Sequence, residues 1–149
     1  MPSRPTRGRH RGERGESLVE FAFATVIFFT VVFGIVEFGI AIWNSNMVSV
    51  LAQEGARFAA VRGSSAPGTC SGPNYLPPCR ASWADVQAYL QTRSYGMNIT
   101  VDTSLTAPGS LAPGGVVTVK VDYNLTAGGG VIPAWSFPIS TSARMTVSR

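Results

Sequence analysis

The chain has 149 residues and a formal net charge of +4, so it offers one domain of ordinary size with a small hydrophobic core. The excess charge lies in the first fourteen residues, which hold five arginines and one glutamate, while the remainder carries seven basic and seven acidic side chains. This distribution excludes a generally basic nucleic-acid-binding domain. Histidine-dependent catalysis has no candidate outside the basic segment, because His10 is the only histidine.

An apolar run over residues 18–43 follows the basic leader at residues 1–15, which its glycines and prolines predict to be unstructured. Only Glu20 and Glu37 interrupt the run. A helix of this length covers a bilayer core of about 30 Å, and the run is longer than the apolar core of a cleaved secretory signal. We therefore expect a retained transmembrane helix over residues 16–43. The arginines before it predict a cytoplasmic N-terminus and a periplasmic or extracellular remainder.

The helical pattern continues past the membrane over residues 44–63. Its apolar positions form a stripe of mostly small residues: Val48, Leu51, Ala52, Gly55, Ala56, Phe58, Ala59 and Ala60. The polar side chains between them, Arg62 included, are expected to stay on the polar face, and Gly63 is expected to cap the helix. One helix should thus run from about Ser17 to Arg62, about 70 Å in length. Its small residues should let the C-terminal domain pack closely against the outer half.

Residues 64–149 are expected to form a small extracytoplasmic α+β domain. Cys70 and Cys79 bound a short loop, and in an oxidising compartment the first interpretation is a structural disulfide. Their spacing fits neither a redox motif nor a four-ligand zinc site. Ser82 and Asp85 have the spacing of a capping box and predict a short helix.

Within that short helix Trp83, Val86 and Leu90 share one face, and Gly96 is expected to end it. Three alternating segments predict half-buried strands at residues 99–105, 117–125 and 139–147. The Gly- and Pro-rich stretches at 107–115 and 127–138 are interpreted as linkers of an antiparallel meander. The expected fold class is α+β: a long N-terminal helix with a transmembrane first half, a short helix and a small three-stranded antiparallel sheet.

No metal site, cofactor or enzymatic activity is predicted. The glycines at 128–130 lack the Lys-Ser/Thr of a phosphate loop, and the three aspartates after the membrane segment are expected to be surface residues. The intramembrane carboxylates are different, because a charge at mid-membrane costs at least about 2–3 kcal/mol and usually has a partner or a role. Glu37 can reach the outer interface or pack between helices, and Glu20 can lie at the inner interface.

The segment around Gly15 has a more specific interpretation. Gly15, Glu16, Glu20 and Phe21 open an apolar helix behind a short basic head, which resembles the processing site of type IV prepilins. That resemblance implies cleavage after Gly15 by a membrane-embedded prepilin peptidase on the cytoplasmic side. It also implies that Glu20, as fifth residue of the mature chain, pairs with the free amine of a neighbouring subunit. The pairing is physically reasonable, because two charges that are each unfavourable in lipid offset each other when they meet.

The resemblance extends along the helix. Glu37-Phe38-Gly39 and the stretch 53–63, QEGARFAAVRG, are similar to the TadE-like family of pseudopilins from tight-adherence (Flp) type IV pilus systems. Membership implies a non-enzymatic subunit for assembly of an adhesive surface fibre, with Glu20 and Glu37 in subunit assembly. The implied partners are the prepilin peptidase, other pilin and pseudopilin subunits, pilus assembly membrane proteins and membrane lipid. The alternative is a single-pass anchored extracytoplasmic binding module that is never processed; an anchored hydrolase is disfavoured for want of catalytic groups.

Overall fold

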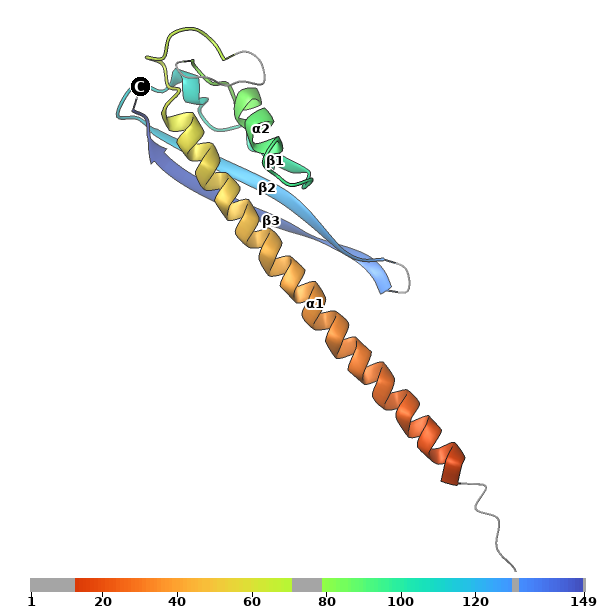
Figure 1. Cartoon of the computed structure of the whole chain (residues 1–149). Coiled ribbons are helices and arrows are strands. Elements are labelled where there is room, and N and C mark those ends of the chain that lie inside the picture. Colours follow the sequence, from red (N-terminus) through yellow and green to blue (C-terminus); the bar gives the residue numbers. More distant parts are fainter. Residues whose placement is uncertain (1–12, 71–78, 130–131, 149) are drawn as a thin grey trace, which may run out of the picture. The chain divides into compact units, whose positions relative to one another are not determined.

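The computed structural model describes residues 13–70, 79–129 and 132–148 (Figure 1). The chain divides into two compact units, Met1–Gly39 and Ile40–Arg149, here called the N-terminal and C-terminal units. The described elements are α1 (Glu13–Ala60), α2 (Trp83–Gln91), β1 (Ile99–Val101), a 3₁₀ helix (Pro108–Ser110), β2 (Val116–Gly129) and β3 (Ile132–Thr146). The three strands form one antiparallel sheet in the order β1-β2-β3. The predicted α+β class, with its long apolar helix, is confirmed.

Helix α1 differs from the prediction at both ends. It begins at Glu13, so the expectation of an unstructured chain up to Gly15 is wrong for its last residues. One glycine inside a helix costs only about 1 kcal/mol relative to alanine, and acidic residues in the first turn are favoured by the helix dipole. At the other end Gly63 does not take the left-handed conformation. The chain turns instead where the Arg62 N–H donates to the Ala59 carbonyl at 3.0 Å.

The outer half of α1 is part of the core of the C-terminal unit, as its small-residue stripe predicted. Gly55 shows why small residues are needed there: a Cβ at this position would lie 3.0 Å from Leu90 Cδ1 on α2 and 3.1 Å from Val119 Cγ1 on β2. The large apolar side chains that are fully buried come from α1, α2, β1, β2 and the residue that follows β3: Val48, Leu51, Val86, Leu90, Ile99, Val117, Val119, Val121 and Val147. One helix therefore supplies both an apolar segment and a wall of the core.

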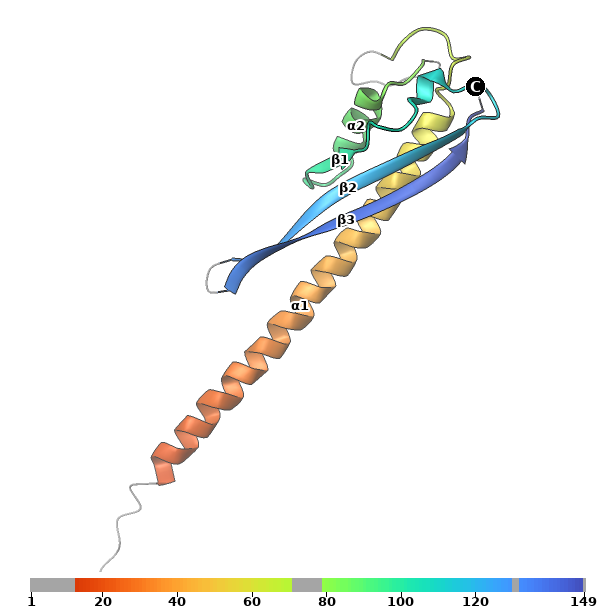
Figure 2. The same cartoon turned by 180° about the vertical axis from the view of Figure 1, so that it is seen from behind.

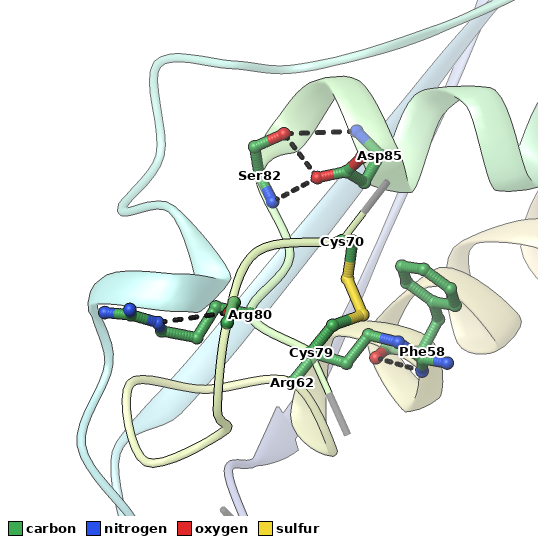
Figure 3. The surroundings of a disulfide bond; sticks show 8 residues. Phe58, Arg62, Cys70, Cys79, Arg80, Ser82 and Asp85 are labelled. Atoms are coloured by element: carbon green, nitrogen blue, oxygen red, sulfur yellow. Dashed lines mark hydrogen bonds between the residues drawn. A yellow bond between two sulfur atoms is a disulfide. The ribbon is translucent and has the colours of Figure 1, made fainter. Parts of the chain in front are cut away.

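Helix α2 begins with the predicted capping box. The Ser82 hydroxyl accepts from the Asp85 N–H at 3.3 Å, and the Asp85 carboxylate accepts from the Ser82 N–H at 2.8 Å (Figure 3). Trp83, Val86 and Leu90 are buried as expected. The helix ends at Gln91, earlier than the predicted stop at Gly96, because a turn with left-handed Tyr95 and Gly96 leads into β1.

Strand β1 is shorter than predicted, whereas β2 and β3 are longer. Strand β1 ends at Val101 rather than at Leu105, whose carbonyl accepts from Trp83 Nε1 at 2.8 Å. Strands β2 and β3 extend to a hairpin whose pairing continues to Gly129 and Ile132, so the linker predicted at 127–138 is wrong. Its prolines are compatible with a strand because β3 is an edge strand, where a missing N–H can face away from the sheet.

Candidate assembly surface

The part of α1 in the N-terminal unit has an almost continuous apolar surface. Most of its large side chains are more than half exposed, for example Leu18 at 69%, Phe21 at 70% and Phe38 at 68%. The hydroxyls of Thr25 and Thr30 donate to carbonyls one turn earlier, at 2.7 and 2.8 Å, so they need no partner from the surroundings. Within the described residues, α1 is the one helix long and apolar enough to cross a membrane.

Two carboxylates stand out on this surface. Glu20 is exposed and Glu37 is partly exposed. They are separated by seventeen residues, which places them about 25 Å apart along the axis and about 100° apart around it. They cannot share a partner. The sequence has no Lys, Arg or His between Arg14 and Arg57, so neither carboxylate has a basic side chain within four residues of it along the helix.

The residues of the predicted processing site lie together at the start of α1. Gly15, Glu16, Glu20 and Phe21 occupy its first turns, and Glu16 and Glu20 share a face because they are four residues apart. A Cβ built at Gly15 meets nothing within 4 Å. Glu37 lies on a different part of the helix. The segment is thus an exposed surface rather than an enclosed site.

The predicted disulfide is formed. Cys70 and Cys79 are bonded with an S–S distance of 2.02 Å (Figure 3). Beside the bond, the Cys70 N–H donates to the Arg80 carbonyl at 3.1 Å and the Arg80 N–H to the Gly68 carbonyl at 3.0 Å. The bond and this short pairing hold the ends of the loop together between α1 and α2. Among the described residues no group of three or more His, Cys, Asp or Glu is placed to hold a metal ion.

The three aspartates after the membrane segment have structural contacts. Asp85 caps α2. Asp102 and Asp122 flank Lys120, with N–O distances of 3.5 and 3.6 Å. Hydrogen bonds from the Ser104 hydroxyl and N–H, with a smaller contribution from Lys120, lower the pKa of Asp102 below its ordinary value. These exposed or partly exposed contacts stabilise a helix start and the sheet surface.

Arg62 is the residue that the sequence analysis misplaced. It was expected on the polar face, but only 6% of it is exposed. Its guanidinium lies 3.9 Å from the centre of the Phe58 ring and donates to the Phe58 carbonyl at 3.1 Å (Figure 3). Burial lowers the pKa of Arg62. The spacing of four residues between Phe58 and Arg62 was a usable signal, because such pairs face each other on a helix.

The Arg62 contact belongs to a larger stack on the same side of α1. The Phe58 ring stacks on Tyr89 of α2 at 4.2 Å, and the Arg93 guanidinium lies 4.5 Å from the centre of the Tyr89 ring. Arg93 also forms an ion pair with Glu54 at 3.2 Å. The alternation of cations and rings fixes α2 against α1, which is a structural role that gives no evidence of a ligand.

A helix with an exposed apolar surface, followed by a small disulfide-bonded α+β unit, is compatible with the class of single-span membrane proteins. The comparison with protein families is more specific, because the model of the TadE-like protein family matches residues 15–57. The match covers the exposed apolar segment and most of the outer half of α1, and it confirms the predicted resemblance. Together with the apolar helix, this match suggests a membrane protein related to Tad pili. No curated protein and no solved structure matches the chain.

Proposed function

We propose that this protein is a pseudopilin, a minor pilin-like subunit for assembly of a tight-adherence type IV pilus, processed by a prepilin peptidase after Gly15. The observation that carries the proposal is the family match, which begins at Gly15 and runs through the exposed apolar part of α1. The leader lies in the cytoplasm and the C-terminal unit outside it. The disulfide supports this orientation, because such bonds persist in oxidising compartments.

In this proposal the partner of Glu20 comes from a second subunit. Cleavage after Gly15 makes a new α-amino group on Glu16, which is a cation at the start of an otherwise apolar helix. Since α1 has no basic side chain between Arg14 and Arg57, the partner that we assign to Glu20 is the α-amino group of a neighbouring pilin or pseudopilin. The two charges offset each other where either alone is unfavourable. Glu37 contributes to helix packing in the outer half of the bilayer.

Processing is tested by the N-terminal sequence and intact mass of the membrane-extracted protein from cells with and without the peptidase. We expect a new terminus at Glu16 only where the peptidase is active. Gly15→Leu should block cutting, whereas Gly12→Leu, three residues earlier, should leave it intact. An uncut chain in both cells would overturn the proposal and favour the anchored binding module that is never processed.

The role of Glu20 is tested separately, in cells that process the protein. Glu20→Ala should be cut and inserted normally but should reduce fibre assembly, because the amine of the neighbouring subunit loses its partner. Glu20→Asp keeps the charge and serves as the matched control, with a smaller loss expected. Normal fibres from the Glu20→Ala cells would rule out the pairing while leaving processing unaffected.

A further inference from the structure

The part of the β2–β3 hairpin that lies beyond Asp122, here called its outer half, carries an exposed aromatic pair. Trp135 is 49% and Phe137 44% exposed, and their ring centres lie 4.4 Å apart in an edge-to-face contact. Phe137 pairs across the hairpin with Leu125, which is buried on the same face of β2 as Val121. The apolar face that forms the core of the C-terminal unit therefore continues outward onto an exposed surface.

This surface is also uncharged. The sequence has no Asp, Glu, Lys or Arg between Asp122 and Arg144, a stretch that contains the whole outer half of the hairpin. Exposed strands at a sheet edge usually carry charges, which oppose pairing with other chains. The absence of charge over so long a hairpin favours a low-polarity environment over an ion-pairing protein partner.

Two contacts show which way the hairpin runs within the C-terminal unit. The Ser148 N–H donates to the Ala60 carbonyl at 2.8 Å, and Val119 contacts α1 at Gly55. From there the hairpin runs away from the Ala60 end, and the far parts of β2 and β3 diverge from α1 (Figures 1 and 2). The distance from Gly55 to Trp43 along the helix is about 18 Å, and that from Val119 to Leu125 along the strand is about 20 Å. The aromatic pair therefore lies near the level of Trp43.

A third segment brings an aromatic residue to the same level. Tyr95, in the turn after α2, is 82% exposed and has a positive φ of 51°. It lines a cavity of about 340 Å³ together with Trp43 and Met47 of α1. Trp43 itself is 52% exposed and ends the apolar run. Aromatic side chains from α1, the turn and the hairpin thus lie at similar levels of the C-terminal unit.

We propose that this aromatic end, defined by Trp43, Tyr95, Trp135 and Phe137, rests on the outer surface of the membrane that α1 crosses. Trp and Tyr are enriched at the interface between lipid and water, where an apolar ring and a polar group are both satisfied. The end is continuous with the exposed apolar side chains of Ile40 and Ile42. The inference rests on the membrane anchoring in the proposed function, but not on processing or fibre assembly.

The test uses the full chain reconstituted in phosphatidylcholine vesicles whose acyl chains carry bromine close to the headgroups. Trp43→Phe/Trp83→Phe leaves Trp135 as the only tryptophan, and Trp83→Phe/Trp135→Phe leaves Trp43 as the matched reference. We expect the brominated lipid to reduce the emission of Trp135 to an extent comparable with Trp43. Quenching of Trp43 without quenching of Trp135 would overturn the inference and leave the anchor intact, whereas quenching of neither would contradict the anchor itself.

Two further measurements keep the result interpretable. Replacing Trp83 removes a buried side chain and its hydrogen bond to Leu105, so Trp135→Phe in the otherwise unchanged protein provides a second route. The part of the tryptophan emission that brominated lipid quenches should be smaller in the Trp135→Phe variant than in the unchanged protein. A second copy of the chain could cover Trp135 in place of the membrane. In that case aqueous acrylamide would be kept from Trp135 only at high protein density, and to the same extent in unbrominated and brominated vesicles. This result would refute the membrane contact.

Discussion

Gly55 allows a direct test of how closely α1 packs in the C-terminal unit. The change to examine is Gly55→Val, which adds three carbon atoms where Leu90 Cδ1 and Val119 Cγ1 would lie 3.0 and 3.1 Å from the first of them. Helix propensity alone favours the variant by a few tenths of a kcal/mol. Overpacking a filled core costs about 1–3 kcal/mol, so the steric term wins. We expect a net loss of about 1–2 kcal/mol in the free energy of unfolding.

The origin of that loss is tested by a double-mutant cycle with Leu90, which is fully buried. Leu90→Ala alone should cost about 2–5 kcal/mol, because it leaves a cavity. Added to Gly55→Val, it should cost less, since the new valine fills part of the space that Leu90 vacates. The two changes should therefore be non-additive by about 1 kcal/mol or more in the favourable direction. Val119 keeps its place, so the rescue is partial.

The assay is denaturant unfolding of the detergent-solubilised full chain, followed by the fluorescence of Trp83, which is 7% exposed in the core. Gly39→Val is the matched control, because a Cβ at Gly39 meets nothing within 4 Å. It should leave the unfolding midpoint unchanged or slightly raised. A neutral Gly55→Val, or strictly additive effects with Leu90→Ala, would refute the close approach of α1 to α2.

Three other predictions concern the C-terminal unit. Replacing both Cys70 and Cys79 with serine should lower the free energy of unfolding by about 2–3 kcal/mol, as expected for so short a loop. Reducing the unchanged protein should lower its denaturant midpoint by the same amount. Reductant should not change the midpoint of the variant. Ser82→Ala should cost about 0.5–2 kcal/mol through loss of the α2 cap, whereas Ser65→Ala, an exposed position, should leave the thermal midpoint in place. Because the folded pKa of Asp102 lies below its ordinary value of 3.8, its stabilising contribution is present above about pH 4 and is lost as the pH falls through the folded pKa. Ser104→Ala should raise that pKa in an NMR titration, and an unchanged titration would contradict the assigned cause.

The features that the sequence predicted well are those decided by local patterns. The apolar run, the small-residue stripe around Gly55 and the capping box at Ser82 each depend on residues within a few turns of one another. The short distance between Cys70 and Cys79 in the sequence made their bond predictable for the same reason. Helix α1 is one long helix, as predicted, and only its first and last residues differ from the prediction.

The features that it missed depend on distant residues. The stretch 127–138 looked like a linker because its glycines and prolines are poor strand formers, yet pairing of Leu125 with Phe137 extends the hairpin through it. Arg62 looked solvent-exposed because arginine usually is, but Phe58 lies against it and Tyr89 of α2 stacks on Phe58. Glu20 differs from both, because the partner proposed for it belongs to another molecule.

The hydrogen bond from Ser148 to Ala60 has a consequence for biosynthesis. The outer half of α1 emerges early, but Val147 and the end of β3, which complete its core, are made about ninety residues later. Contacts so distant in sequence form late in folding. While the later part of the chain is being made, the stripe around Gly55 therefore stays uncovered. The interval before β3 is complete is when this protein is most open to mispairing with other chains, and any protein that covers the stripe in that interval would aid its maturation.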